Sequence, residues 1–98
     1  MAASVFLITY DLNKPGQDYP GLYDAIKAQS NGAWWHYLDS TWLIATNKTT
    51  AQVRDAIKQA VDTSDHFLVV DISRDPYSGW LPKKAWDWIK QWVDGLAA

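Results

Sequence analysis

Residues 4–11 read SVFLITYD, an apolar run that stops on an acid. Most of its residues are β-branched or aromatic, and the run is too short for a helix of ordinary length. Because polar residues do not recur at every second position, the pattern predicts a strand that is buried on both faces and lies in the middle of a sheet. Asp11 is then expected where the centre of the sheet meets solvent. The turn-rich stretch 13–21 follows it, so we expect a chemical site there first.

Composition bounds the size and setting of the protein. Its 98 residues suit one compact domain, 1–98. The absence of cysteine excludes a disulfide framework and a thiolate metal site. No signal-peptide pattern or membrane-length segment is present, so we expect a cytoplasmic protein without a membrane partner. The formal net charge of −2 and the scattered basic residues provide no basic face for RNA or DNA.

Two helices are predicted on either side of a hairpin. In the first, Asp18 is a candidate N-cap, and Gly32 suits the left-handed conformation that closes many helices. Its inward stripe recurs at helical spacing and comprises Leu22, Ala25, Ile26 and Gln29. The second helix opens with the capping-box pattern of Thr49 and Gln52 and continues with apolar residues at helical spacing through 53–61.

The strands complete a recognisable order of elements. Two strand-like runs, 33–38 and 41–46, flank the polar pair Asp39-Ser40, which is typical of a tight hairpin. A last strand follows at 66–73. The order strand, helix, strand, strand, helix, strand predicts a ferredoxin-like α/β (α+β) sandwich. In this βαββαβ fold both helices lie on one face of an antiparallel sheet, with the first and third strands in the centre.

The C-terminal segment adds an element to this sandwich. Residues 82–94 are expected to form an appended helix, opened by Pro82 and closed by Gly95. Its apolar face is unusually wide and consists of two stripes, one with Trp86, Ile89, Val93 and Leu96 and the other with Trp88 and Trp92. We expect this helix either to cap the open face of the sheet or to take part in a dimer.

The predicted topology brings polar side chains together at one end of the sheet, because neighbouring strands run antiparallel. The residues expected there are Asp11, Asn13, Asp39, Ser40, Thr41, Asp65 and His66. Oxygen ligands of this kind suit a hard cation, Mg²⁺ or Mn²⁺. One carboxylate is a poor metal site, whereas a two-fold homodimer would bring two copies of Asp11 toward a shared ion.

These residues carry a resemblance to a known family. The ITYDL ending of the first strand, the order of elements and the step DSTWL into the third strand look like the CRISPR-associated protein 2 family and its relatives, over residues 4–73. Members are ferredoxin-like homodimers and include divalent-metal nucleases, structural partners of the spacer integrase and toxin-like ribonucleases. The resemblance implies that Asp11, flanked by Tyr10, is the metal-binding residue of a phosphodiesterase (an endonuclease).

Two features depart from that family. The first predicted helix carries only Lys27 where members usually carry several basic residues, which weighs against nucleic acid binding. The C-terminal segment has a helical pattern where members commonly have a strand. The resemblance therefore implies a divergent relative.

Each candidate residue also has a structural role open to it. Asp11 either binds metal or accepts hydrogen bonds from the backbone amides of Asn13 or Lys14 in the following turn. His66 is either a general base near Asp11 or a structural residue that opens a strand. Three tryptophans either pack in the core or a dimer interface or stack on bases: Trp34, Trp35 and Trp42.

Two functions therefore stand beside each other. One is a Mg²⁺- or Mn²⁺-dependent phosphodiesterase that uses paired Asp11 residues for catalysis and metal binding, with His66 as a further catalytic candidate. The other is a non-enzymatic homodimeric module that binds or scaffolds a protein, nucleotide or nucleic acid partner.

Overall fold

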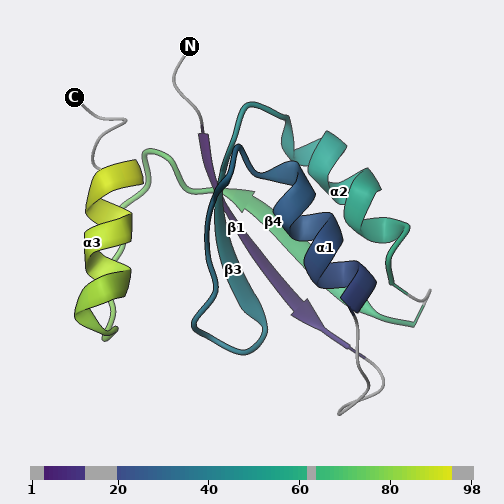
Figure 1. Ribbon diagram of the computed structural model, residues 1–98, viewed down its shortest axis with the longest axis horizontal. Coiled ribbons are helices and arrows are strands. Elements are labelled where there is room, and N and C mark those ends of the chain that lie inside the picture. Colours follow the sequence, from purple (N-terminus) through teal and green to yellow (C-terminus); the bar gives the residue numbers. More distant parts are fainter. Residues whose placement is uncertain (1–3, 13–19, 62–63, 94–98) are drawn as a thin grey trace.

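The computed structural model describes residues 4–12, 20–61 and 64–93. It has an α+β architecture with one four-stranded antiparallel sheet in the order β2-β3-β1-β4 and three helices. The strands are β1 (Ser4–Asp11), β2 (Ala33–Trp35), β3 (Thr41–Thr46) and β4 (His66–Asp71), and the helices are α1 (Pro20–Gln29), α2 (Thr50–Lys58) and α3 (Lys83–Trp92). In Figure 1, α1 and α2 cover one face of the sheet and α3 lies on the other.

The strand β1 has its predicted bounds and lies between β3 and β4. Phe6 and Ile8 belong to the core beneath α1 and α2, whereas Val5 and Leu7 face α3. The prediction of a central strand buried on both faces is therefore confirmed. Asp11, its last residue, is exposed to solvent.

Local capping signals define α2. The backbone N–H of Gln52 donates to Thr49 Oγ1 (3.1 Å), and the backbone N–H of Thr49 donates to Gln52 Oε1 (2.9 Å). Both halves of the predicted capping box are thus present. Farther along the helix, Val53 and Ile57 are completely buried in the core that α2 shares with α1 and the sheet.

The helix α1 begins at Pro20. The N-cap predicted at Asp18 lies outside the described residues. Within α1, Leu22 and Ile26 are completely buried, as their spacing predicts. Gly32 follows the helix with φ of 90°, the left-handed backbone expected at that position.

The hairpin between β2 and β3 differs from the prediction. The N–H of Thr41 donates to the carbonyl of Leu38 (3.1 Å), which closes the expected turn around 39–40. The ladder, however, pairs Trp35 with Leu43, one residue out of register with that turn. Because of this offset, the backbone pairing that starts at the turn cannot continue into the β2–β3 ladder, and β2 ends at Trp35. The predicted turn at 39–40 is therefore confirmed, whereas the prediction that the second strand runs to residue 38 was wrong.

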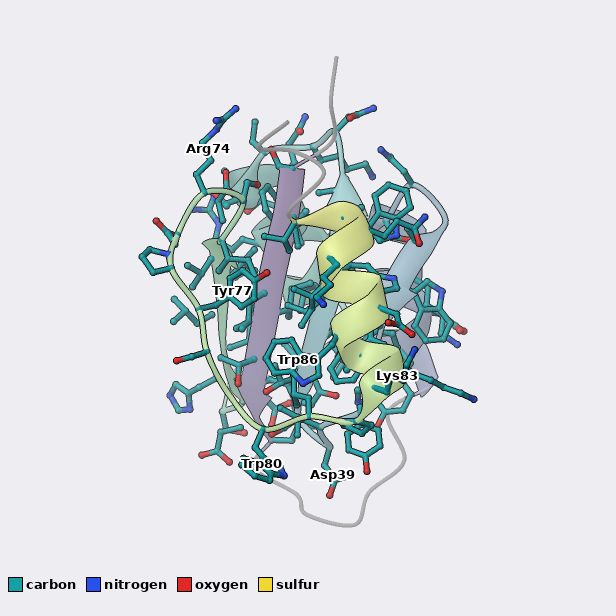
Figure 2. The ribbon with its side chains drawn as sticks, turned by 90° about the vertical axis from the view of Figure 1, so that its left-hand side faces the viewer. Asp39, Arg74, Tyr77, Trp80, Lys83 and Trp86 are labelled. Atoms are coloured by element: carbon teal, nitrogen blue, oxygen red, sulfur yellow. The ribbon has the colours of Figure 1, made fainter. Side chains whose placement is uncertain are left out.

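The appended helix α3 caps the second face of the sheet, one of its two expected placements (Figure 2). Pro82 is its N-cap, as predicted. Ile89 and Val93 form a second buried cluster with Val5 and Leu43 of the sheet. Around it pack the partly buried tryptophans Trp35, Trp86, Trp88 and Trp92. The helix ends at Trp92 with Val93 as its C-cap, two residues before the predicted end at 94, and the predicted members Gly95 and Leu96 lie outside the described residues. None of the described helices has the length and apolarity needed to span a bilayer.

Candidate functional site

Asp11 and His66 lie directly opposite each other on β1 and β4. Directly opposed residues of an antiparallel pair point to the same face, with Cβ atoms about 5 Å apart. Every second side chain of a strand points to the same face, so Asp11 points to the same face as Leu7. Farther along the sheet, α3 covers this face. Both side chains are exposed. The end of the sheet therefore presents a carboxylate and an imidazole side by side to solvent.

The carboxylate of Asp11 has no hydrogen bond or ion pair within residues 4–12, 20–61 and 64–93. No described residue therefore occupies this carboxylate, and a ligand can reach it. The alternative of a turn closed by the amides of Asn13 or Lys14 lies outside the described residues, as does Asn13 as a site member.

The hairpin turn approaches the same end of the sheet. Thr9 and Thr41 are cross-strand partners with hydroxyl oxygens 3.3 Å apart, and the N–H of Tyr10 donates to the carbonyl of Ser40 (3.1 Å). Asp65 directly precedes β4 and is buried. Asp39 instead extends outward at the lower end in Figure 2. In the described ranges, no group of three or more His, Cys, Asp or Glu side chains could hold a metal ion.

A buried polar network that the sequence did not predict supports this end of the sheet. Trp42 Nε1–H donates to the hydroxyl of Tyr10 (3.1 Å), and that hydroxyl donates to the carbonyl of Asp39 (3.3 Å). His36 Nε2 lies 3.1 Å from the same carbonyl. Loss of solvent raises the pKa of Tyr10 to about 12. Tyr10 therefore stays protonated at neutral pH and acts as a structural tie between β1 and the turn.

An aromatic surface, comprising Tyr23, Lys27, Trp34 and His36, forms where α1 meets β2. The His36 ring stacks on Trp42 with centroids 4.0 Å apart, and Tyr23 meets His36 edge-on at 5.4 Å. Trp42 is 1% exposed and therefore packs in the core, whereas Trp34 is 40% exposed. Lys27 Nζ lies 4.7 Å from the ring centroid of Trp34.

Two cavities flank the sheet. One of about 580 Å³ lies between α2 and β4, and His66 is among its lining residues. The other, of about 360 Å³, lies between α3, the sheet and the connection before α3, with Leu7, Leu43 and Trp86 in its walls. Asp11 lines neither cavity.

No protein-family model matches this chain, and no solved structure matches it either. The resemblance to the CRISPR-associated protein 2 family rests on the residues and element order given above and stays a prediction.

Proposed function

We propose that this chain is a divergent relative of the CRISPR-associated protein 2 family with a ferredoxin-like fold, and that it hydrolyses phosphodiester bonds of RNA or DNA as a homodimer. The cross-strand pair of Asp11 and His66 carries this proposal. The sheet order β2-β3-β1-β4, with α1 and α2 on one face, supports the fold assignment, because two interleaved strand-helix-strand units have this arrangement.

The metal would be Mg²⁺ or Mn²⁺, held through the carboxylate of Asp11. A single protomer offers one carboxylate, that of Asp11, which is fewer ligands than either cation needs. A second protomer would add another Asp11, so this donor set fits a metal in a dimer. Bound there, the metal would neutralise phosphate charge and acidify a water molecule.

The residues of the chain itself have separate roles in this hydrolysis. His66 accepts the proton of the attacking water as a general base. The bond between phosphorus and the leaving oxygen then breaks, and the leaving oxygen takes up a proton from solvent. Tyr10 and Trp42 hold β1 to the hairpin turn and so position Asp11 without touching the substrate.

Exposed apolar side chains at the same end support the homodimer. Trp80 is 98% exposed and Tyr37 is 61% exposed, and Leu38 is also exposed. Figure 2 shows Trp80 and Asp39 at the same, lower end of the molecule. Large apolar side chains gathered on a surface are typical of protein interfaces. A two-fold axis at this end would bring the two copies of Asp11 toward each other.

A cleavage assay tests the enzymatic proposal. The parent, Asp11→Asn, His66→Gln and the matched control Asp24→Asn are incubated with RNA and DNA panels and Mn²⁺. We expect cleavage by the parent and by Asp24→Asn, which changes an exposed acid on α1, and a loss on the order of a hundredfold in the other two. No cleavage by the parent defeats the hydrolase proposal. Full activity of Asp11→Asn defeats the role of Asp11 and indicates a contaminant.

A second function, a non-enzymatic homodimeric module for a nucleotide or nucleic acid partner, is supported by the aromatic surface. Trp34 offers a partly exposed ring and Lys27 a cation above it, which suit a base and a phosphate. Fluorescence titration with single-stranded oligonucleotides tests it. Weaker binding by Trp34→Ala and Lys27→Ala, with Lys90→Ala unchanged, supports this function. Equal binding by all of them contradicts it.

A further inference from the structure

The strand β4 forms a long edge of the sheet, since among the described residues it pairs with β1 alone. Its sequence HFLVVD contains neither proline nor lysine, two residues that commonly protect sheet edges from pairing. The opposite edge strand, β2, has three residues. The edge of β4 is therefore the longer template for an added strand.

The outward backbone groups of β4 can be identified from its pairing. The N–H of Ile72, just past the strand, donates to the carbonyl of Val5 on β1 (2.9 Å). Because successive residues of an antiparallel strand direct their N–H and C=O groups alternately toward and away from one neighbour, the outward groups belong to Phe67, Val69 and Asp71. No backbone hydrogen bond of these groups to another element is found in the described part of the chain.

A groove runs beside this edge. The cavity of about 580 Å³ has β4 and the residue before it on one side and α2 on the other. On the α2 side, Ala51, Arg54 and Lys58 recur at spacings of three and four, so they form one row along the helix. Val61, Phe67 and Val69 supply apolar surface between the two walls. The helix and the strand edge thus border an open groove whose volume is within the range that ligands occupy.

The helix wall of this groove is cationic. Arg54 and Lys58 line the groove, and both are exposed. Asp65 also lines the groove, but it is 8% exposed and already has an interaction within the protein. Arg54 contacts Asp55 at 3.0 Å, and both side chains are more than half exposed, so this ion pair is weak and can be exchanged. The charge favours an acidic occupant.

A second copy of the chain fits this groove poorly. Two β4 edges paired antiparallel about a two-fold axis would place both α2 helices on the same face of one continuous sheet. Arg54 and Lys58 of each copy would then face those of the other across the seam, which like-charge repulsion disfavours.

We infer that the groove between α2 and β4 binds an extended acidic peptide segment of another protein, which adds to the sheet as a fifth strand. Alternate side chains of the peptide point toward the α2 face, where acids meet Arg54 and Lys58. The intervening side chains point to the opposite face, beside Leu68, which is 59% exposed. Apolar residues suit those positions.

A capped heptapeptide of alternating Asp and Val probes this site, with a Lys-for-Asp peptide as its control. The ¹⁵N-labelled full chain is titrated while shifts and amide exchange are followed by NMR. We expect binding of the acidic peptide alone, with slowed exchange at Phe67, Val69 and Asp71. The double variant Arg54→Glu/Lys58→Glu should bind about tenfold more weakly or worse. Lys84→Glu/Lys90→Glu on α3 makes the same change in net charge and should bind like the parent.

Methylation of the peptide nitrogens tests the strand pairing without altering the protein. In one peptide series the Asp nitrogens are methylated, and in a second series the Val nitrogens are. Only one of these two sets of N–H groups faces β4, so one series should lose binding and the other should keep it. Retention of binding by both series overturns the inference, as does unchanged affinity of the Arg54→Glu/Lys58→Glu variant. Failure of the acidic peptide to bind overturns it too. Exchange protection of Val69 that grows with protein concentration without peptide would assign the edge to a second copy and overturn it as well.

Discussion

The indole N–H of Trp42 donates a hydrogen bond of 3.1 Å to the hydroxyl of Tyr10, which joins β3 to β1 inside the core. The same hydroxyl donates to the carbonyl of Asp39 in the hairpin turn. The phenol of Tyr10, the residue immediately before Asp11, thus connects both central strands and the hairpin turn. The position of the candidate site depends on this contact.

Tyr10→Phe should destabilise the protein, because it leaves the indole N–H of Trp42 buried without its acceptor. We expect the free energy of unfolding to fall by about 1–3 kcal/mol in urea denaturation. Tyr37→Phe removes an exposed hydroxyl and should leave stability unchanged. Equal stability of the two variants would show that the buried hydrogen bond contributes nothing measurable.

Because of Tyr10, we expect the protein to lose stability at alkaline pH. Burial raises the pKa of Tyr10 from 10.0 to about 12, so the folded state holds this proton more tightly than the unfolded chain does. The stability that comes from this tighter binding of the proton is complete below the pKa of Tyr10 in the unfolded chain. It is lost as pH rises through the pKa of Tyr10 in the folded protein. Over that window the free energy of unfolding should fall more steeply in the parent than in Tyr10→Phe, by up to about 1.4 kcal/mol per pH unit. Parallel pH profiles of the two proteins would contradict the raised pKa.

The two hydrogen bonds of the capping box between Thr49 and Gln52 should contribute to the stability of the protein as a coupled pair. Thr49→Ala removes the acceptor for the Gln52 amide and should cost about 1 kcal/mol. Gln52→Ala removes the reciprocal contact. Because the two residues form one motif, their effects should not add in a double-mutant cycle. Strict additivity would mean that the two bonds act independently.

The contact between α3 and the sheet should contribute strongly to stability. Ile89→Ala removes buried methyl groups from the cluster with Val5, Leu43 and Val93 and should cost about 2–4 kcal/mol in thermal or urea unfolding. Lys90→Ala, at the next and exposed position, is the control. A small effect of Ile89→Ala would show that α3 is not docked on the sheet in solution.

Asp11→Asn and His66→Gln should leave stability within about 0.5 kcal/mol of the parent, because both side chains are exposed and Asp11 has no described partner. Chemical denaturation of the purified variants measures this difference. A loss well above that size in Asp11→Asn would favour the alternative role of Asp11 in the turn after β1.

Features set by local sequence were predictable. The strand β1 could be bounded because its apolar run ends abruptly at Asp11, and the start of α2 could be placed because Thr49 and Gln52 satisfy each other. The meeting of Asp11 with His66 followed from antiparallel order, since it requires only that both residues lie at one end of the sheet.

Features set by tertiary register were not predictable. The early end of β2 at Trp35 results from a one-residue offset between the ladder and the turn, which no pattern in residues 33–46 reveals. The stacking of His36 on Trp42 needs the positions of both strands. The groove beside β4 likewise depends on how far α2 stands from the sheet edge, a distance that helical spacing does not determine.

The helix α3 follows in sequence every strand that it covers. During translation the ribosome therefore delivers β1 to β4 before the cover for Val5, Leu7 and Leu43 exists. In that interval a nascent chain shows a bare apolar surface to its surroundings, the kind of exposure that recruits chaperones or starts aggregation.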